Sequence, residues 1–387
     1  MSFLDIENRL EQLKRSQLIR ERLVIDSPQA SELIVDGEQF INFASNDYLG
    51  LAANHAAADA LNEATQRYGF GSGASHLIVG HQLPHEALEQ SFANFVERDA
   101  ALSFSSGYMA NIGILQSLAQ KGDMILADKL NHASLIDGVR LSSANSLRYL
   151  HCDIEALEKR LSRSSQNTFV VTDSVFSMDG DIAPLDKIAA LCEKYNAVLI
   201  VDDAHGFGVL GEKGRGAAEY FSLNQKQLPV LMSTLGKALG GYGAMVSGEK
   251  NIISYLTQTA RSYIYTTAMP APIAAANLQN LQKLQSDDSL LKNLHKNIEN
   301  FKNQCKQNEI SSSASETPIQ PLIIGDNEKL LAIKTALQLR GILVGAIRPP
   351  TVPKNSARLR ITITAAHSNE QIERLVSGLK TSLAEVS

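Results

Sequence analysis

The chain has 387 residues, 44% of them hydrophobic, and a formal net charge of -5. This composition excludes a wholly disordered chain, and the length exceeds what one hydrophobic core usually supports, so we expect one large domain and one smaller domain. No run of lysine or arginine is present to follow a phosphate backbone or an anionic membrane, so nucleic acid and membrane are not expected as partners.

Cysteine usage and the N-terminal pattern indicate a cytoplasmic protein. The three cysteines, Cys152, Cys192 and Cys305, form no CxxC pair and suggest neither a zinc knuckle nor a disulfide framework. The first residues lack the apolar core of a signal peptide, and the spacing of Ile6, Leu10 and Leu13 predicts an amphipathic helix.

The next segments predict a hairpin and then an alternating α/β region. ELIVDGEQFINFAS places Asp36 and Gly37 between two apolar runs, a strong signal for a β-hairpin leading into the main body. From about Asn54, helical patterns such as LPHEALEQSFANFVE alternate with short apolar strands such as TFVVTDSVF and AVLIVDDAH. This alternation predicts a mostly parallel sheet with helices on both faces.

The pattern changes near Met269. PAPIAAANLQNLQKL opens a long helical stretch, and the remainder alternates strands such as IQPLIIGD and ARLRITITA with helices, which indicates a smaller α+β unit. We therefore predict an N-terminal helix and hairpin segment over 1–45, a large α/β domain over 46–270 and a small C-terminal domain over 271–387.

Three motifs favour no function of their own. GFGVLG, Gly206 to Gly211, matches GxGxxG, but the charged, glycine-containing EKGRGAAEY follows it instead of a helix, so we expect a loop. STLGKA lacks the first glycine and the final Ser or Thr of a P-loop. His76, His81 and His85 have neither an acidic nor an HExxH context, so we expect surface or loop histidines and no metal.

Polar residues follow several predicted strands, where open α/β sheets bind ligands. Such strand ends carry Asp202 and His205, Asp173 and Ser177, the SSG before Tyr108, and His132 before a helix. Each has an ordinary alternative as a turn or helix cap. Lys237, between Gly236 and Ala238 in STLGKALGG, also follows a predicted strand. A lysine amine, a carboxylate, a helix N-terminus for a phosphate and a histidine together are what pyridoxal 5'-phosphate requires.

The chain resembles the α-oxoamine synthases, fold-type I (aspartate aminotransferase-like) pyridoxal-phosphate enzymes, over nearly its whole length. The resemblance rests on FASNDYLGL, FSSGYMAN, NHAS, VFSMDGDIAPL, VDDAHGFGVLG, STLGKALGG, YIYTTAMP and AIRPPTVPKNSARLRITITAAH. One segment, GSGASHLIVG, departs from the family. Ala74 stands where relatives often carry glycine, and His76 stands where they often carry glycine or arginine.

The resemblance implies a role for each matching residue. Lys237 would form the Schiff base, Asp202 would pair with the pyridinium nitrogen and His132 would stack on the ring. The other cofactor contacts implied are Ser177, His205, Gly107, Tyr108, Thr234 and, across a homodimer interface, Thr266. Arg348 would bind the carboxylate of the amino acid, and the remaining substrate contacts would be Arg20, Asn46 and Thr351.

The reaction implied is a decarboxylating condensation of an amino acid with an acyl thioester, by resemblance L-alanine with pimeloyl-CoA or a pimeloyl-carrier protein. Lys237 would act as general base. AIRPPTVP favours this reading over the glycine-using members, 2-amino-3-ketobutyrate CoA ligase and 5-aminolevulinate synthase. Alternatives from other classes are a nucleotide-dependent oxidoreductase built on GFGVLG and a pyridoxal-phosphate protein without activity.

Overall fold

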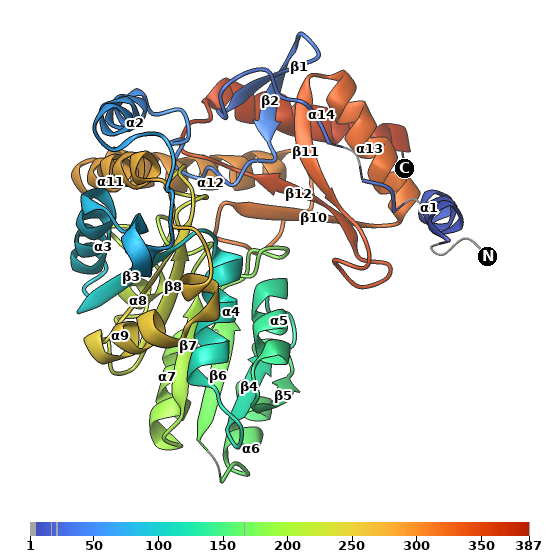
Figure 1. Ribbon diagram of the computed structural model, residues 1–387. Helices are drawn as coiled ribbons and strands as arrows, with labels where there is room; N and C mark the ends of the chain where they lie inside the picture. Colours follow the sequence, from blue (N-terminus) through green and yellow to red (C-terminus); the bar gives the residue numbers. More distant parts are fainter. Residues whose placement is uncertain (1–4, 17, 21, 166, 387) are drawn as a thin grey trace.

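A computed structural model describes residues 5–16, 18–20, 22–165 and 167–386. The chain forms two units, each built around one β-sheet, with the large unit below and the small unit above in Figure 1. No helix in these ranges is both long and apolar enough to cross a lipid bilayer.

The large unit contains a seven-stranded sheet in the order β3-β9-β8-β7-β6-β4-β5. All neighbouring strands pair in parallel except β9, which is antiparallel to β3 and β8. The bounds are β3 (Ala100–Phe104), β4 (Met124–Asp128), β5 (Asn145–Tyr149), β6 (Thr168–Asp173), β7 (Val198–Asp202), β8 (Val230–Thr234) and β9 (Ala244–Gly248). The predicted mostly parallel sheet is confirmed.

The central strands are apolar throughout because both faces of the sheet are covered. Val170 and Val201 contribute to the hydrophobic core on one face, and Val171 and Ile200 contribute to the core on the other. The helices of this unit are α2 (His55–Tyr68), the π-helix η1 (His76–Gly80), α3 (Leu83–Phe95), α4 (Gly107–Leu118), α5 (Ala133–Leu141), α6 (Ile154–Leu161), α7 (Leu185–Lys194), α8 (Ala217–Tyr220), α9 (Lys250–Thr259), α10 (Arg261–Ile264) and α11 (Ala271–Ser286). GFGVLG forms turns, as expected, and opens no helix.

The small unit has a five-stranded sheet in the order β1-β2-β11-β12-β10. Its elements are β1 (Glu32–Val35), β2 (Glu38–Phe43), α12 (Ser289–Gln307), β10 (Ile319–Gly325), α13 (Asn327–Leu339), β11 (Ile342–Ile347), β12 (Ala357–Thr362) and α14 (Asn369–Val386). The predicted hairpin is present, with Asp36 and Gly37 both at positive φ, and β2 pairs in parallel with β11. The N-terminal hairpin therefore belongs to the same sheet as the C-terminal strands.

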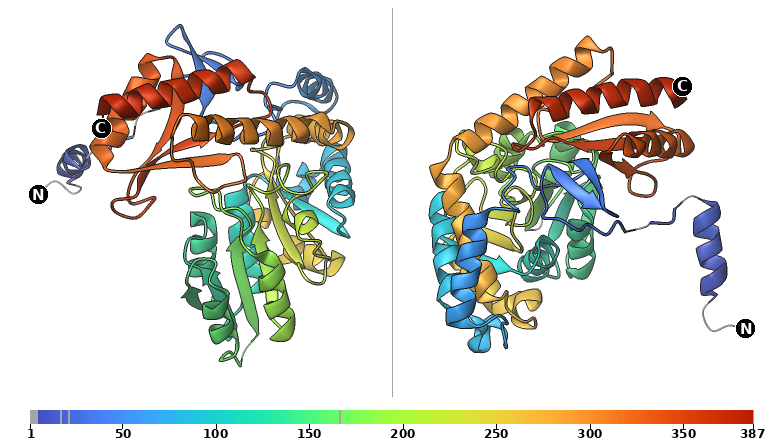
Figure 2. Two further views of the ribbon diagram at one scale, coloured as in Figure 1. Left: turned by 180° about the vertical axis from the view of Figure 1, so that it is seen from behind. Right: turned by 90° about the horizontal axis from the view of Figure 1, so that it is seen from above.

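The N-terminal helix α1 (Ile6–Arg15) lies apart from both units, as the right-hand view of Figure 2 shows. It has the predicted amphipathic pattern but buries no residue. At the other junction, α11 packs against α2 and α3 of the large unit. The division of the chain at residues 45 and 270 stays a prediction.

Candidate functional site

The carboxyl ends of β6, β7 and β8 bring together four of the residues that the sequence singled out, Asp173, Asp202, His205 and Lys237. Asp173 and Asp202 are partners in the parallel pairing of β6 with β7, and Asp202 is the partner of Met232 in the pairing of β7 with β8. Lys237 follows β8 in a tight turn. Its Nζ lies 2.7 Å from Nε2 of His205, which follows β7.

The amine of Lys237 is held in a form that favours loss of its proton. Burial lowers the pKa of Lys237 from its ordinary value to about 8, against the opposing effect of the Asp202 and Asp173 carboxylates. Burial also lowers the pKa of His205 far below its usual value, with the Lys237 charge acting in the same direction. A neutral imidazole therefore faces the amine, and the hydroxyl of Tyr48 lies 2.5 Å from the other ring nitrogen.

Asp202 is fixed by two hydrogen bonds at the base of the site. Asn111 Nδ2 on α4 donates to its Oδ2 at 2.7 Å, and the Ala204 amide donates to its Oδ1 at 2.9 Å. The adjacent Asp203 has a different task, since it accepts bonds from Ser174 Oγ at 2.5 Å and from the amide of Ala217 at the start of α8. Of these two neighbouring carboxylates, Asp202, the last residue of β7, is the one whose charge acts on Lys237.

His132 lies at the start of α5 and is directed by its neighbours. Its amide donates to Asp173 at 2.8 Å, and its Nδ1 lies 2.7 Å from Ser134 Oγ. Burial lowers the pKa of the His132 imidazole, while the Asp202 carboxylate opposes that shift and the Lys237 ammonium adds to it. His132 thus caps a helix, the ordinary alternative, and also lies within electrostatic range of both Lys237 and Asp202.

The N-terminus of α4 lies beside β8. A Cβ atom built on Gly107 would lie 3.3 Å from the Met232 side chain, and the preceding Ser106 caps the helix by accepting from the Met109 amide. The first amides of a helix lack partners inside it and suit an anion. The hydroxyl of Thr234, at the end of β8, donates to the Gly243 carbonyl at 3.1 Å.

Arg360 belongs to this site although the sequence did not single it out. The residue is buried on β12 of the small unit, and its Nε donates 2.7 Å to the carbonyl of Ser177 in the large unit. Its Nη1 donates 3.0 Å to Asn46 Oδ1. The charge of Arg360 also contributes to the lowered pKa of Lys237. Arginine at alternate positions of an apolar strand, as in ARLRIT, is the sequence signal that could have identified it.

Arg348 lies elsewhere, in a polar cavity of about 660 Å³ between the N-terminal segment, α13 and β11. Its lining includes Arg20, Lys334 and Thr351. Arg348 Nη2 donates a hydrogen bond to the Ile19 carbonyl at 3.3 Å. Lys237 is not among the described residues that line this cavity. The structure thus brings Arg20, Arg348 and Thr351 together and groups Asn46 with Arg360 instead.

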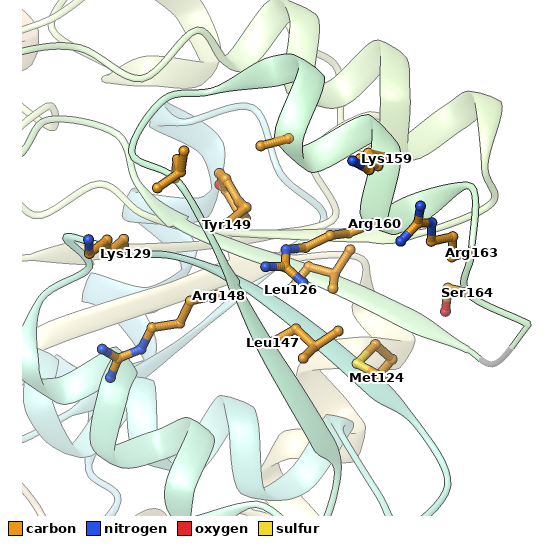
Figure 3. A pocket seen from close by; sticks show the side chains of 12 residues that line it. Met124, Leu126, Lys129, Leu147, Arg148, Tyr149, Lys159, Arg160, Arg163 and Ser164 are labelled. Carbon is orange, nitrogen blue, oxygen red and sulfur yellow. The ribbon is translucent and has the colours of Figure 1, made fainter.

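Thr266 lies between α10 and α11, in a segment whose neighbours Tyr265 and Thr267 are exposed. Another cavity, of about 500 Å³, lies between β4, β5 and α6 and contains none of the predicted site residues. Figure 3 shows the Arg160 side chain extended over its apolar floor of Leu126 and Leu147.

The expectation of surface or loop histidines was wrong for two of the three. His76 and His85 are buried and His81 is half-buried, and the three imidazole rings pack against one another. The second half of GSGASHLIVG, His76–Gly80, forms the π-helix η1, and the His76 ring packs against that of His85 in the first turn of α3.

Comparison with known proteins places the chain in a family. Residues 38–379 match the model of the class I and II aminotransferases. The 8-amino-7-oxononanoate synthase of Stutzerimonas stutzeri is 48% identical over 97% of this chain and 96% of its own length. The chain belongs to the 8-amino-7-oxononanoate synthase family.

Solved structures agree with this family membership. The 8-amino-7-oxononanoate synthase of Francisella tularensis is 35% identical, with a TM-score of 0.77 over 89% of this chain and 98% of that one. A serine palmitoyltransferase of S. paucimobilis, solved with PLP and myriocin, is 28% identical, with a TM-score of 0.93 over 99% of this chain and 98% of that one. The predicted family and fold class are confirmed.

Proposed function

We propose that the chain catalyses the decarboxylating condensation of L-alanine with a pimeloyl thioester, giving 8-amino-7-oxononanoate, the free thiol and CO2 in biotin biosynthesis, with pyridoxal 5'-phosphate as cofactor. The observation that carries this proposal is the buried amine of Lys237, 2.7 Å from the neutral His205, within reach of the Asp202 charge. The relatives that match nearly the whole chain bear the name of this enzyme.

The described residues fit the cofactor. Lys237 supplies an amine that readily becomes neutral, and Asp202, anchored by Asn111, supplies a carboxylate for the pyridinium nitrogen. The amides of Gly107 and Tyr108 would donate to the phosphate, the hydroxyl of Thr234 would do so after exchanging its present acceptor, the Gly243 carbonyl, for a phosphate oxygen, and His132 would cover the ring. Ser177 and His205 are assigned to the neighbourhood of the 3'-oxygen.

The protein's own contribution to the chemistry is proton transfer and positioning. When bound, pyridoxal phosphate supplies an aldehyde for amines and a ring that accepts electrons from the substrate α-carbon. Lys237 Nζ takes the α-proton of the amino acid as general base, for which a pKa near 8 is well matched. The Asp202 carboxylate would lie beside the ring nitrogen, held there by Asn111. Acyl transfer joins the substrate α-carbon to the acyl carbon and breaks the thioester C–S bond, which releases the thiol. The amino-acid carboxylate then leaves as CO2, and the α-carbon takes up a proton.

Two arginines are available for substrate carboxylates. Arg360 donates hydrogen bonds to Asn46 and to the Ser177 carbonyl, and its charge lowers the pKa of Lys237. We assign it to the carboxylate of the amino acid. Arg348, which the family resemblance assigned to that task, lies in the cavity with Arg20 and Thr351 and is the alternative. Both use a planar guanidinium, which can bind a carboxylate through two parallel hydrogen bonds.

The proposal includes a homodimer in the cytoplasm. The half-buried Thr266 lies between the exposed Tyr265 and Thr267, so this segment reaches the surface where a second copy of the chain would contact it. Whether the acyl donor is pimeloyl-CoA or a pimeloyl-carrier protein is part of the test.

The test combines a spectrum with an activity assay. Purified protein supplied with pyridoxal phosphate is titrated with L-alanine and then glycine, and thiol release is followed after addition of pimeloyl-CoA or pimeloyl-carrier protein. We expect a cofactor band that borohydride abolishes, a response to alanine and thiol release. Lys237→Ala should lose the borohydride-fixed link between the cofactor and the chain, lose thiol release, and keep its circular dichroism. A preference for glycine would make the chain a sister enzyme, and a bound cofactor without turnover would make it a non-catalytic protein.

A further inference from the structure

Three histidine side chains meet where η1 joins the start of α3. The ring centroids of His76, His81 and His85 lie 5.0 to 5.4 Å apart. One nitrogen from each ring lies within 4.8 Å of the others. The role proposed for the catalytic site uses none of these residues.

Two of the rings have their outer nitrogen bound to an acceptor. His85 Nε2 lies 2.6 Å from the carbonyl of Met269, which can only accept, so His85 carries its proton on Nε2 and a lone pair on Nδ1. His81 Nε2 lies 3.3 Å from Oε2 of Glu86 in the same way. Histidines that bind metals usually donate their other ring N–H to a carbonyl or a carboxylate, which is the arrangement of both rings.

The third ring, that of His76, is hydrogen-bonded to the ring of His81. His76 Nδ1 lies 3.0 Å from His81 Nδ1, and the His76 ring is stacked on Tyr263 at 5.0 Å with an angle of 11° between the planes. Two lone pairs would repel at this distance, so one ring donates an N–H to the other. With His81 protonated on Nε2, the donor is His76 Nδ1.

We propose that His76, His81 and His85 bind one divalent transition-metal ion of the zinc, cobalt and nickel class through their Nδ1 atoms. Three imidazole nitrogens with a fourth position for water form a common coordination set for such ions. When the metal binds, the proton of His76 moves from Nδ1 to Nε2, so that Nδ1 has a lone pair for the metal. His85 Nδ1 gives up the hydrogen bond that it accepts from the Gln82 amide, at 2.9 Å, and binds the metal instead. That amide belongs to Gln82, the N-cap residue of α3, and an amide at a helix N-terminus that loses its side-chain partner can bond to water instead.

The metal would fasten the loop of η1 to the segment that precedes α11. The Ala268 amide donates to the Ala74 carbonyl at 3.1 Å, and Ser72 Oγ donates to the Ala268 carbonyl at 2.6 Å. His85 already binds the adjacent Met269. Because the metal would bind the folded chain and not the unfolded one, it should raise the melting temperature.

The test uses the full-length holoenzyme without a histidine tag, metal-stripped and free of amino acids, which chelate metals. Titration with Zn²⁺ in a calorimeter and with Co²⁺ in a visible spectrometer should show one ion per chain and a rise in the melting temperature. His81→Gln is the informative variant, because His81 is half-buried and its replacement leaves the buried His76 and His85 in place.

The matched control is His55→Gln, which removes an exposed histidine at the start of α2. We expect His81→Gln to weaken binding of both ions at least tenfold and His55→Gln to leave it unchanged. Failure of the wild-type chain to bind either ion at micromolar concentration, or equal binding by the two variants, would overturn the site. Neither outcome affects the proposed condensation, which is measured separately.

Discussion

Lys237 Nζ and His205 Nε2 lie 2.7 Å apart, although the two residues follow different strands of the large sheet. The pairing of β7 with β8 brings the two strand ends to the same edge. Because His205 is neutral, its Nε2 can accept a hydrogen bond from the amine without adding a second positive charge. This relationship, together with the carboxylates nearby, explains why a lysine is placed among small residues after an apolar strand.

The rate of covalent cofactor attachment should depend on pH through Lys237. Only the neutral amine attacks an aldehyde, and the folded pKa lies near 8, so the rate should rise as the pH increases through about 8. Replacing Arg360 with Gln removes a cation that lowers this pKa, so the midpoint should move to higher pH. The measurement is the rate of absorbance change of the apoprotein with pyridoxal phosphate, with acetyl-lysine as control; coincident profiles for the wild type and the variant would contradict the prediction.

The two arginines should separate in steady-state kinetics. We expect Arg360→Lys to raise the KM for alanine by about 10- to 100-fold, because a bidentate contact becomes a single one, while the KM for the acyl donor changes little. Arg348→Lys should act mainly on the acyl donor. The reverse pattern would assign the amino-acid carboxylate to Arg348.

The imidazole of His151 should contribute stability that declines at high pH. Burial lowers the pKa of His151, but hydrogen bonds to Asp128 at 3.0 Å and Asp181 at 2.8 Å outweigh it and raise the value to about 12. Since the folded value exceeds the unfolded one, the stabilisation is complete below about pH 6.5 and is lost as the pH rises toward 12.

We therefore expect His151→Gln to lower the free energy of unfolding by about 1–3 kcal/mol at pH 6, an amount reduced because His151 is only half-buried. The difference should shrink at pH 9. Urea denaturation at both pH values measures it, and a difference that grows with pH would refute the assignment.

Cys152 should be replaceable with a gain in stability. Its φ is 52°, in the left-handed region where asparagine is several times more common than most other residues. Cys152→Asn should raise the free energy of unfolding by about 0.5–1 kcal/mol, measured by urea denaturation. Cys152→Ala, which lacks the polar side chain, serves as control and should show no gain; equal stability of the two variants would contradict the conformational explanation.

The sequence predicted the parts of the structure that local patterns determine. The hairpin at Asp36 and Gly37 was confirmed because both turn residues adopt the positive φ that this turn requires. The clustering of Asp202, His205 and Lys237 followed from the rule that parallel strands present their carboxyl ends at one edge. Each of these features depends on a short segment or on a general property of the fold.

Contacts between the two units could not be predicted in the same way. Arg360 reaches the carbonyl of Ser177 only because β12 packs near the loop after β6, and no local pattern specifies that approach. The histidine cluster needed the π-helical turn of η1, which brings His76 back toward His81 and His85. Burial of these rings depends on Tyr263 and Met269, which are distant in sequence.

The pairing of β2 with β11 has a consequence for synthesis of the chain on the ribosome. Ile41 is the partner of Ile342, so the small sheet cannot close until nearly the whole chain has emerged. The strands of the large sheet, from Ala100 to Gly248, are complete much earlier and pair mostly with near neighbours. The β2 edge of the hairpin at residues 32–43 therefore stays unpaired until β11 has been synthesised. A chain truncated before β11 would expose this edge to pairing with other chains, which favours aggregation.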